Sequence, residues 1–210
     1  MSENPEWIKA KALPESDYSY IKKLLAKYNL HTVCQSALCP NIGECWSAKT
    51  ATFMILGDIC TRNCRFCSVK SGNPDCYTDL KEPENIAKAV NELGLKFVVL
   101  TSVTRDDLED GGSEHFAQTI KAIKKMNNSI MIEVLIPDFK GNLTSLKRVI
   151  YAKPDILAHN IEVVNRLSKN VRDSNADYCR SLSLLKKAKL INPEITTKSS
   201  FMVGLGESFD

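Results

Sequence analysis

Residues 52 to 67 have the sequence Thr52-Phe-Met-Ile-Leu56-Gly-Asp-Ile-Cys60-Thr-Arg-Asn-Cys64-Arg-Phe-Cys67, and this stretch decides the fold. Its first part, Thr52–Leu56, is a short apolar run typical of a buried strand. Its second part is a loop with three cysteines at C-x3-C-x2-C spacing. Parallel β/α proteins build their sites on the loops that follow the strands, so this stretch predicts a β/α domain with its chemistry at the strand ends.

The same alternation continues to the end of the chain. We expect further strands at Lys96–Ser102, Ile130–Ile136, Asp155–Ala158 and Ile195–Val203. Helical patterns lie between them at Pro83–Leu93, Ser113–Met126, Leu143–Tyr151 and Ala176–Leu190. Apolar strands separated by helices predict a parallel sheet covered by helices. Right-handed crossovers make this sheet an open or closed β/α barrel.

Residues 1–50 differ from the rest and are predicted to form an N-terminal extension to the main domain at 51–210. An amphipathic stretch at Tyr18–Tyr28 predicts a short helix, and loops are expected after it. These loops carry a second triad, Cys34, Cys39 and Cys45, at C-x4-C-x5-C spacing.

Six of the eight cysteines therefore fall within 34 residues, as two unlike triads. Three thiolates leave one position of a four-iron cluster without a ligand from the triad, and an open iron can bind a substrate or cofactor. The pattern predicts an enzyme with two iron-sulfur clusters, held by Cys34, Cys39 and Cys45 and by Cys60, Cys64 and Cys67.

Two simpler uses of cysteine fit less well. Zinc sites close with four ligands, usually from paired C-x2-C knuckles, whereas each triad here supplies three cysteines at unequal spacing. Disulfide frameworks stabilise small secreted chains, whereas this chain has 210 residues, 43% hydrophobic content and no signal-peptide pattern.

Charge and hydropathy restrict the partners. The 28 basic and 25 acidic residues give a net charge of +3, too small to indicate a nucleic-acid groove or an anionic membrane surface. No apolar run approaches the ~18 residues of a membrane span, and the first residues lack the character of a transit peptide. We therefore expect no nucleic-acid or membrane partner and a cytoplasmic location, where thiols stay reduced.

Polar residues follow the other expected strands as well. Thr101 and Ser102 end the second strand, Asn160 and Glu162 follow the fourth, and Lys198 lies in the fifth. Loops after parallel strands share one face of the sheet, so these groups are expected to converge over the second cysteine triad.

Two sets of motifs resemble known families. The C-x3-C-x2-C loop after a first barrel strand is similar to the signature of radical S-adenosylmethionine (SAM) enzymes. The segment Leu30-His-Thr-Val-Cys34-Gln-Ser-Ala-Leu-Cys39-Pro-Asn-Ile-Gly-Glu-Cys45-Trp46 closely resembles the auxiliary-cluster segment of the lipoyl synthase family. The likeness extends over nearly the whole chain, through Ala51–Asp58, Thr101-Ser-Val, Arg105-Asp-Asp-Leu, Asp110-Gly-Gly112, Ile132–Asp138 and Gly204-Leu-Gly-Glu207.

The resemblance implies a radical SAM barrel of (β/α)6 type and an enzyme that inserts two sulfur atoms, at C6 and C8 of an octanoyl-lysine. It implies two 4Fe-4S clusters: the Cys60, Cys64, Cys67 cluster binds SAM and generates the radical, and the Cys34, Cys39, Cys45 cluster donates sulfur. The implied partners are octanoylated lipoyl-carrier domains (E2 subunits of 2-oxoacid dehydrogenases and the glycine cleavage H protein) and a ferredoxin or flavodoxin electron donor.

Individual roles in binding SAM follow from the same resemblance. Phe66 is expected beside the adenine, with core packing as its alternative role. Asn160 and Glu162 are expected at the ribose or methionine. Thr101 and Ser102 are expected at the methionine amine, with capping of the next segment as their alternative role. A buried lysine needs an anion, so Lys198 is expected at the methionine carboxylate, with a solvated lysine as the alternative. His115 and His159 are expected to be ordinary packing or second-layer residues.

One departure from the family pattern concerns the C-terminal end. Lipoyl synthases carry an Arg-Ser-Ser-Tyr motif whose serine ligates the auxiliary cluster, and the chain lacks it. With the chain ending at Asp210, we expect an N-terminal portion of such an enzyme, without the sixth β/α unit. The alternative functions are another two-cluster radical SAM enzyme, such as a methylthiotransferase, and a non-catalytic iron-sulfur or carrier-binding remnant.

Overall fold

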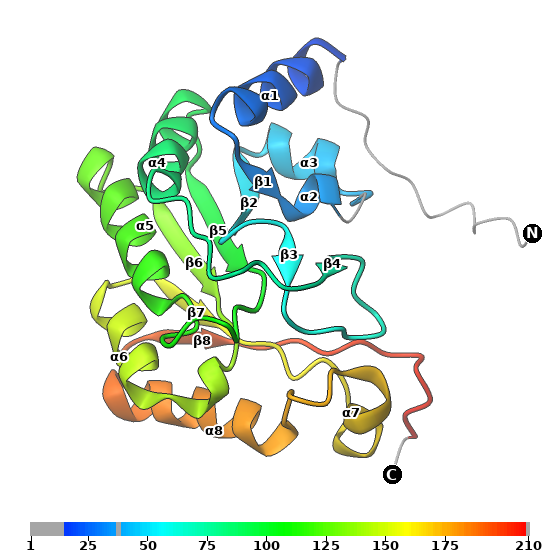
Figure 1. The fold of residues 1–210 in the computed structure, drawn as a ribbon. Helices are drawn as coiled ribbons and strands as arrows, with labels where there is room; N and C mark the ends of the chain where they lie inside the picture. Colours follow the sequence, from blue (N-terminus) through cyan, green and yellow to red (C-terminus); the bar gives the residue numbers. More distant parts are fainter. Residues whose placement is uncertain (1–14, 37–38, 209–210) are drawn as a thin grey trace, which may run out of the picture.

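The fold is a six-stranded sheet with helices packed along one side of it (Figure 1). The computed structural model describes residues 15–36 and 39–208, so the first part of the expected extension and Asp210 lie outside the described residues. The strand order is β1-β2-β5-β6-β7-β8. The strands are β1 (His31–Thr32), β2 (Thr50–Ile55), β5 (Phe97–Ser102), β6 (Met131–Leu135), β7 (Ile156–Ala158) and β8 (Thr196–Lys198).

All neighbouring strands from β2 to β8 pair in parallel, and β1 joins the edge of β2 antiparallel. Five parallel strands follow one another in chain order, which confirms the predicted α/β class with a parallel sheet. The register aligns Met54 of β2 with Thr101 of β5 and Leu135 of β6, so these three strands end at a common edge.

The helices between the parallel strands are α4 (Glu82–Glu92), α5 (Ser113–Met126), α6 (Leu143–Tyr151) and α8 (Tyr178–Ile191). Figure 1 shows them side by side along one side of the sheet. Their start signals are local: Pro83 lies in the first turn of α4, and the Asn142 side chain accepts hydrogen bonds from two backbone N–H groups at the start of α6. No helix in the described part of the chain is long and apolar enough to cross a membrane.

The core lies between this helix layer and the sheet. Alternate strand residues point toward the helices and are fully buried, among them Phe53, Ile55, Leu100, Val134 and Leu157. The opposite alternation leaves the other face more open, since Val99 and Ile156 are only half-buried. Side chains of that face are therefore available to a site at the strand ends.

The N-terminal region is more regular than the sequence indicated. It contains α1 (Glu15–Lys27), β1, α2 (Val33–Ser36) and α3 (Ile42–Ser47), where loops were expected after the first helix. Such short helices give too few turns for an amphipathic pattern to stand out. Tyr18 of α1 stacks on Trp46 of α3, with ring centroids 5.7 Å apart, and this contact fastens the first helix to the cysteine-bearing segment.

Four further elements differ from expectation. The last strand ends at Lys198 instead of Val203, because the chain leaves the ladder at Ser199; Phe201 forms only an isolated bridge with Glu162. The helix α7 (Asn165–Val171) was missed, since its seven residues include only two large apolar side chains. The paired strands β3 (Ile59–Cys60) and β4 (Lys70–Ser71) were also missed, because two residues give no readable alternation.

Candidate functional site

The C-x3-C-x2-C loop, residues 60–67, connects β3 to β4 beyond the end of β2. Backbone N–H groups point at two of its sulfurs. The N–H groups of Arg62 and Thr104 each lie 3.4 Å from Cys60 Sγ, and the N–H of Asp173 lies 3.3 Å from Cys64 Sγ. Hydrogen bonds of this kind favour a thiolate and tune the electronics of a metal bound to it.

The charge of this triad favours a bound cation. Burial raises the pKa of the Cys64 thiol; the backbone N–H of Asp173 lowers it in part, while the charges of Asp173, Cys67 and Cys60 raise it further. Three thiolates placed together therefore repel one another, and a bound metal relieves that repulsion because its ligands must be deprotonated.

The first triad lies on α2, on the loop after it and on α3. Cys34 is buried, while Cys39 and Cys45 are half-buried. The pKa of the Cys45 thiol is raised by burial and then by the charges of Cys34, Cys39 and Glu44. The N–H of Cys39 donates to the carbonyl of Cys34 at 3.1 Å and so closes the loop that joins them.

The type of metal group can be tested against the geometry. Among residues 15–36 and 39–208, no three His, Cys, Asp or Glu side chains converge closely enough to hold a single metal ion. A zinc ion with bonds of about 2.3 Å brings its sulfurs to roughly 4 Å from one another, whereas each thiolate of a four-iron cluster binds its own iron. The triads therefore fit clusters better than zinc. All eight cysteines are free in the structure.

Arg62, inside the cysteine loop, anchors that loop to its surroundings. Its Nε lies 2.7 Å from Asp106 Oδ2, and its Nη2 lies 2.7 Å from Asp138 Oδ1. Arg180 of α8 holds the other oxygen of Asp138 at 3.0 Å. Burial opposes ionisation of Asp138, but the hydrogen bonds and charge of the two arginines outweigh it and lower the pKa of this carboxyl. The loops after β5 and β6 are thus tied to the cysteine loop through charge.

A second set of contacts ties the loop to the segment after α7. The N–H of Asn63 donates to Asp173 Oδ2 at 2.9 Å, and the N–H of Arg65 donates to the carbonyl of Val171 at 2.9 Å. These contacts come from backbone groups of the loop itself. The path of the loop is therefore fixed by the segments that follow β5 and β6 and by the end of α7.

Next to this loop lies a cavity of about 350 Å³ at the strand ends. Its wall contains all three cysteines of the loop and five of the six side chains predicted to bind SAM: Phe66, Thr101, Ser102, Asn160 and Glu162. These residues come from the cysteine loop and from the ends of β5 and β7. The structure therefore brings together, in one cavity, groups that are up to a hundred residues apart in the chain.

Among these residues, Ser102 has an unpaired hydroxyl and Glu162 has an unusual backbone conformation and a shifted pKa. The hydroxyl of Ser102 is buried and has no hydrogen-bond partner in the structure, so a ligand in the cavity could supply one. Glu162 has a left-handed backbone, with φ of 67°, and burial raises the pKa of its carboxyl, although a hydrogen bond from Asn160 lowers it in part. The hydroxyl of Thr101 already donates to the carbonyl of Leu135 at 3.1 Å.

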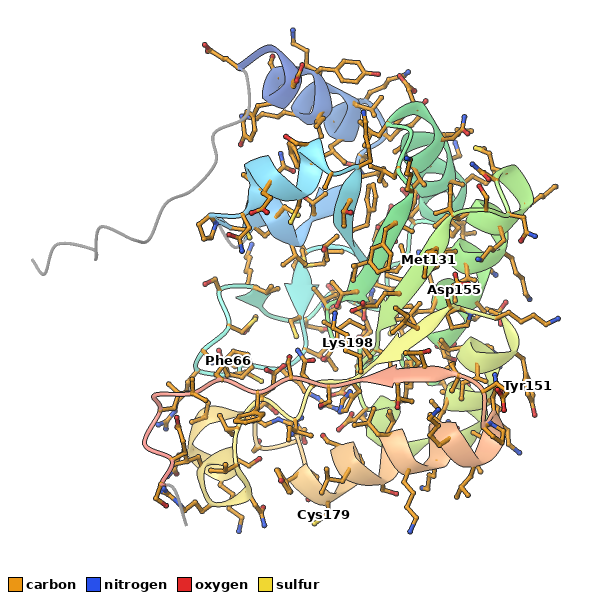
Figure 2. All side chains as sticks on the ribbon, turned by 180° about the vertical axis from the view of Figure 1, so that it is seen from behind. Phe66, Met131, Tyr151, Asp155, Cys179 and Lys198 are labelled. Carbon is orange, nitrogen blue, oxygen red and sulfur yellow. The ribbon has the colours of Figure 1, made fainter. Side chains whose placement is uncertain are left out.

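Lys198 is the exception among the predicted residues. It does not line the cavity; its Nζ lies 2.8 and 3.0 Å from the two carboxylate oxygens of Glu133 on β6. Figure 2 shows Lys198 over the sheet and apart from Phe66. The anion that Lys198 meets in this structure is thus a protein carboxylate.

Several residues that line the cavity were not predicted as site residues from the sequence. Arg62, Asp138 and Arg172 line the wall, and so does His159, which was expected to be an ordinary second-layer residue. His159 is buried, with Nδ1 2.8 Å from the carbonyl oxygen of Ile136 and Nε2 2.9 Å from Ser181 Oγ. Arg62 and Asp138 carried a signal, because Arg62 lies inside the cysteine motif and Asp138 ends the motif Ile132–Asp138; Arg172 carried none.

Comparison with known proteins gives consistent results. Residues 54–210 match the model of the radical SAM superfamily. The chain is 56% identical to a lipoyl synthase of Symbiobacterium thermophilum over 99% of its own length and 64% of that protein's, and 55% identical to one of Caldicellulosiruptor saccharolyticus, over 99% and 72%. It thus spans about two thirds of the length of these relatives.

Similarity to solved structures concerns the fold. The FeFe-hydrogenase maturase HydG from Carboxydothermus hydrogenoformans aligns with a TM-score of 0.62 at 19% identity, over 92% of this chain and 49% of that one. At such low identity the likeness supports the arrangement of strands and helices and carries no statement about chemistry.

Proposed function

Because the chain belongs to the radical SAM superfamily and, within it, to the lipoyl synthase family, we propose that it takes part in inserting two sulfur atoms, at C6 and C8 of a protein-bound octanoyl-lysine. The observation that carries the proposal is the cavity whose wall combines Cys60, Cys64 and Cys67 with the residues expected to hold SAM.

The cysteine loop would hold one 4Fe-4S cluster, and Cys34, Cys39 and Cys45 would hold the other. When bound, the first cluster and SAM supply a 5′-deoxyadenosyl radical able to react at unactivated carbon, and the second cluster supplies the sulfur. A carbon radical of this kind also reacts with other accessible C–H and S–H bonds, so a site at the end of a packed sheet suits it.

The protein's own residues have positioning roles. The backbone N–H groups of Arg62 and Thr104 hold the sulfur of Cys60 in place, and that of Asp173 holds the sulfur of Cys64. We assign the adenine face to Phe66, which is 37% exposed at the cavity, and the ribose hydroxyls or methionine to Asn160 and Glu162. The unpartnered hydroxyl of Ser102 is available to the methionine amine, and Thr101 supports the same wall.

The partners follow from the same proposal. The substrate would be an octanoylated carrier domain, from an E2 subunit or the H protein, and a ferredoxin or flavodoxin would deliver electrons. Both belong to a reducing compartment, and we accordingly propose a cytoplasmic location.

The test is an anaerobic reconstitution with iron and sulfide, followed by two separate measurements. Cleavage of SAM to 5′-deoxyadenosine is measured by chromatography, and lipoylation of an octanoyl carrier domain is measured by mass spectrometry, since each inserted sulfur changes the mass. Cys67→Ala should abolish SAM cleavage. Cleavage that persists in this variant would refute the assignment of the loop.

The outcome also separates the alternatives. Cleavage with transfer of a methylthio group would identify a methylthiotransferase, and iron binding without SAM cleavage would identify a non-catalytic iron-sulfur protein. The carrier assay reports on the whole activity, whereas SAM cleavage reports on the site described above.

A further inference from the structure

A buried set of contacts surrounds Leu56, the residue that directly follows β2. Leu56 has φ of 68°, in the left-handed region, and only 4% of its surface is exposed. A residue with a branched side chain disfavours this conformation, so the surroundings must hold it there. Leu56 begins the short connection that leads to Cys60.

Both backbone groups of Leu56 are held by buried charged side chains. Its N–H donates to Glu82 Oε2 at 2.8 Å, and its carbonyl accepts from Arg105 Nη1 at 3.2 Å. His115 Nε2 lies 2.6 Å from the same oxygen of Glu82. Glu82, Arg105 and His115 are 4%, 1% and 7% exposed, so water competes little for these bonds.

The side chain of Leu56 is enclosed as well. A Cβ built on Gly112 would lie 2.2 Å from Leu56 Cδ1, and Gly112 has φ of 85°. Only glycine fits this position, for both steric and conformational reasons. Gly112 immediately precedes α5, which carries His115, while Glu82 begins α4. The first turns of two helices thus meet at this one residue.

The same contacts continue toward the cysteine loop. Arg105 is fixed by Asp107 at 2.7 Å and by the carbonyl of Tyr77 at 2.8 Å. Its neighbour Thr104 donates its N–H to Cys60 Sγ, and the carbonyl of Thr104 accepts the N–H of Thr61 at 3.0 Å. Arg105 therefore connects the turn at Leu56 with the residue that contacts the first cysteine sulfur.

We propose that Glu82, His115 and Arg105 form a clamp on Leu56 that positions the cysteine loop for its cluster. They are positioning residues, because none of the three lines the cavity. Glu82 and Arg105 contact the backbone of Leu56, and His115 acts through Glu82. The inference rests on the proposed function, because it concerns the cluster of the Cys60 loop. It assigns a role to His115, for which the sequence indicated packing alone.

The experiment compares reconstituted, reduced variants by electron paramagnetic resonance, with and without SAM. The change of signal on adding SAM reports on the cluster that binds SAM, which we assign to the Cys60 loop. Glu82→Ala removes the acceptor of both Leu56 and His115, and we expect the SAM-dependent signal per protein to fall at least threefold. Glu82→Gln keeps an acceptor oxygen and should retain most of the signal.

The matched control is Val149→Ala, in the buried face of α6 and outside both the clamp and the cavity. It should lower the melting temperature while leaving the SAM-dependent signal of the folded protein unchanged. The clamp would be overturned if Val149→Ala and Glu82→Ala had equal melting temperatures and lost the same share of the SAM-dependent signal. General destabilisation would then explain both results.

If Glu82→Ala does not fold, His115→Ala and His115→Gln are compared instead, because these variants keep the hydrogen bond that the Leu56 N–H donates to Glu82. The glutamine should restore the signal that alanine loses. An unchanged signal in the alanine variants, beside a responsive wild type, overturns the clamp alone. A wild type that binds iron but shows no response to SAM overturns the proposed function, and the clamp with it.

Discussion

The guanidinium of Arg62 lies 2.7 Å from the carboxylate of Asp138, and the two side chains are 6% and 0% exposed. One of these residues sits between two cysteines of the proposed cluster loop, and the other follows β6. An ion pair this deeply buried has lost its hydration, so each partner depends on the other. Their contact fixes the position of the cysteine loop relative to the segment that follows β6.

Removal of Arg62 should therefore be costly. Arg62→Ala leaves Asp138 buried with Arg180 as its remaining charged partner, and loss of one partner of a buried pair typically costs about 3–5 kcal/mol. We expect a loss of about 3 kcal/mol in the free energy of unfolding, measured by urea denaturation of the apo protein.

The control is Lys27→Met, which breaks the exposed pair between Lys27 and Glu92, and a far smaller change is expected there. A similar loss of unfolding free energy in both variants would show that the buried ion pairs contribute no more to stability than an exposed one.

Much of the sheet and of the cavity wall could be predicted from the sequence, because the strands that carry these residues have strong local signals. The runs around β2, β5 and β6 were predicted to within a few residues, since apolar, β-rich segments between helices identify parallel strands without tertiary information. Five SAM-binding candidates met in one cavity for a related reason: loops after parallel strands share an edge.

The rest depended on partners distant in sequence. Nothing near Glu82 indicates that it contacts Leu56 and His115, because the distance in the chain exceeds 25 residues on either side. Lys198 illustrates the same limit: its place in a strand was predicted, but the nearby carboxylate of Glu133 was not. Periodicity identifies the element that a residue occupies, and it does not identify the partner of a charge.

The stability of the apo protein should depend on His159. Burial lowers the pKa of His159, with Arg172 and Arg62 acting in the same direction, while the carbonyl of Ile136 and the charge of Asp138 oppose the shift. Since the folded pKa lies below the unfolded value of about 6.5, the unfolded chain takes up a proton first as the pH falls. Stability should therefore be complete above about pH 6.5 and decline below it.

The variant His159→Asn tests this pH dependence. Asparagine can still donate to the carbonyl of Ile136 but does not titrate, so the slope of unfolding free energy between pH 5 and 6.5 should decrease by up to about 1.4 kcal/mol per pH unit. Urea denaturation across this range gives the slope. An unchanged slope would mean that other groups, such as the carboxylates, produce the acid sensitivity.

The two triads should hold iron independently. Anaerobic reconstitution should give up to about eight irons per chain if both sites fill. Replacing Cys60, Cys64 and Cys67 by alanine should reduce this to about four, and replacing Cys34, Cys39 and Cys45 should do the same. Iron and protein analysis checks the numbers, and stoichiometric zinc in anaerobically purified protein would contradict both sites.

Ser102 offers a test in which stability and ligand binding are expected to diverge. Its buried hydroxyl has no protein partner, so Ser102→Ala should leave the free energy of unfolding unchanged or raise it by about 1 kcal/mol. If the hydroxyl bonds SAM, the same change should weaken SAM binding by about 3- to 10-fold, the equivalent of one ordinary hydrogen bond. Equilibrium binding to the reconstituted protein decides, with Thr119→Val on α5 as a buried hydroxyl variant outside the cavity.

Lys198 separates a role in the sheet from a role in binding SAM. Its ammonium pairs with Glu133, whose side chain is 7% exposed, whereas Lys198 itself is 57% exposed. Lys198→Met leaves a nearly buried carboxylate without this partner, so the protein should lose stability, by about 1 kcal/mol after allowance for the exposure of the lysine. Adding Glu133→Gln to this variant should recover part of the loss, because the buried charge is then gone.

The affinity for SAM should stay within about twofold of wild type in Lys198→Met and in the double variant, since the cavity wall does not include Lys198. A tenfold loss of SAM binding in Lys198→Met, without a matching loss in Glu133→Gln alone, would instead place Lys198 at the methionine carboxylate, and the pairing with Glu133 would then describe only the ligand-free protein.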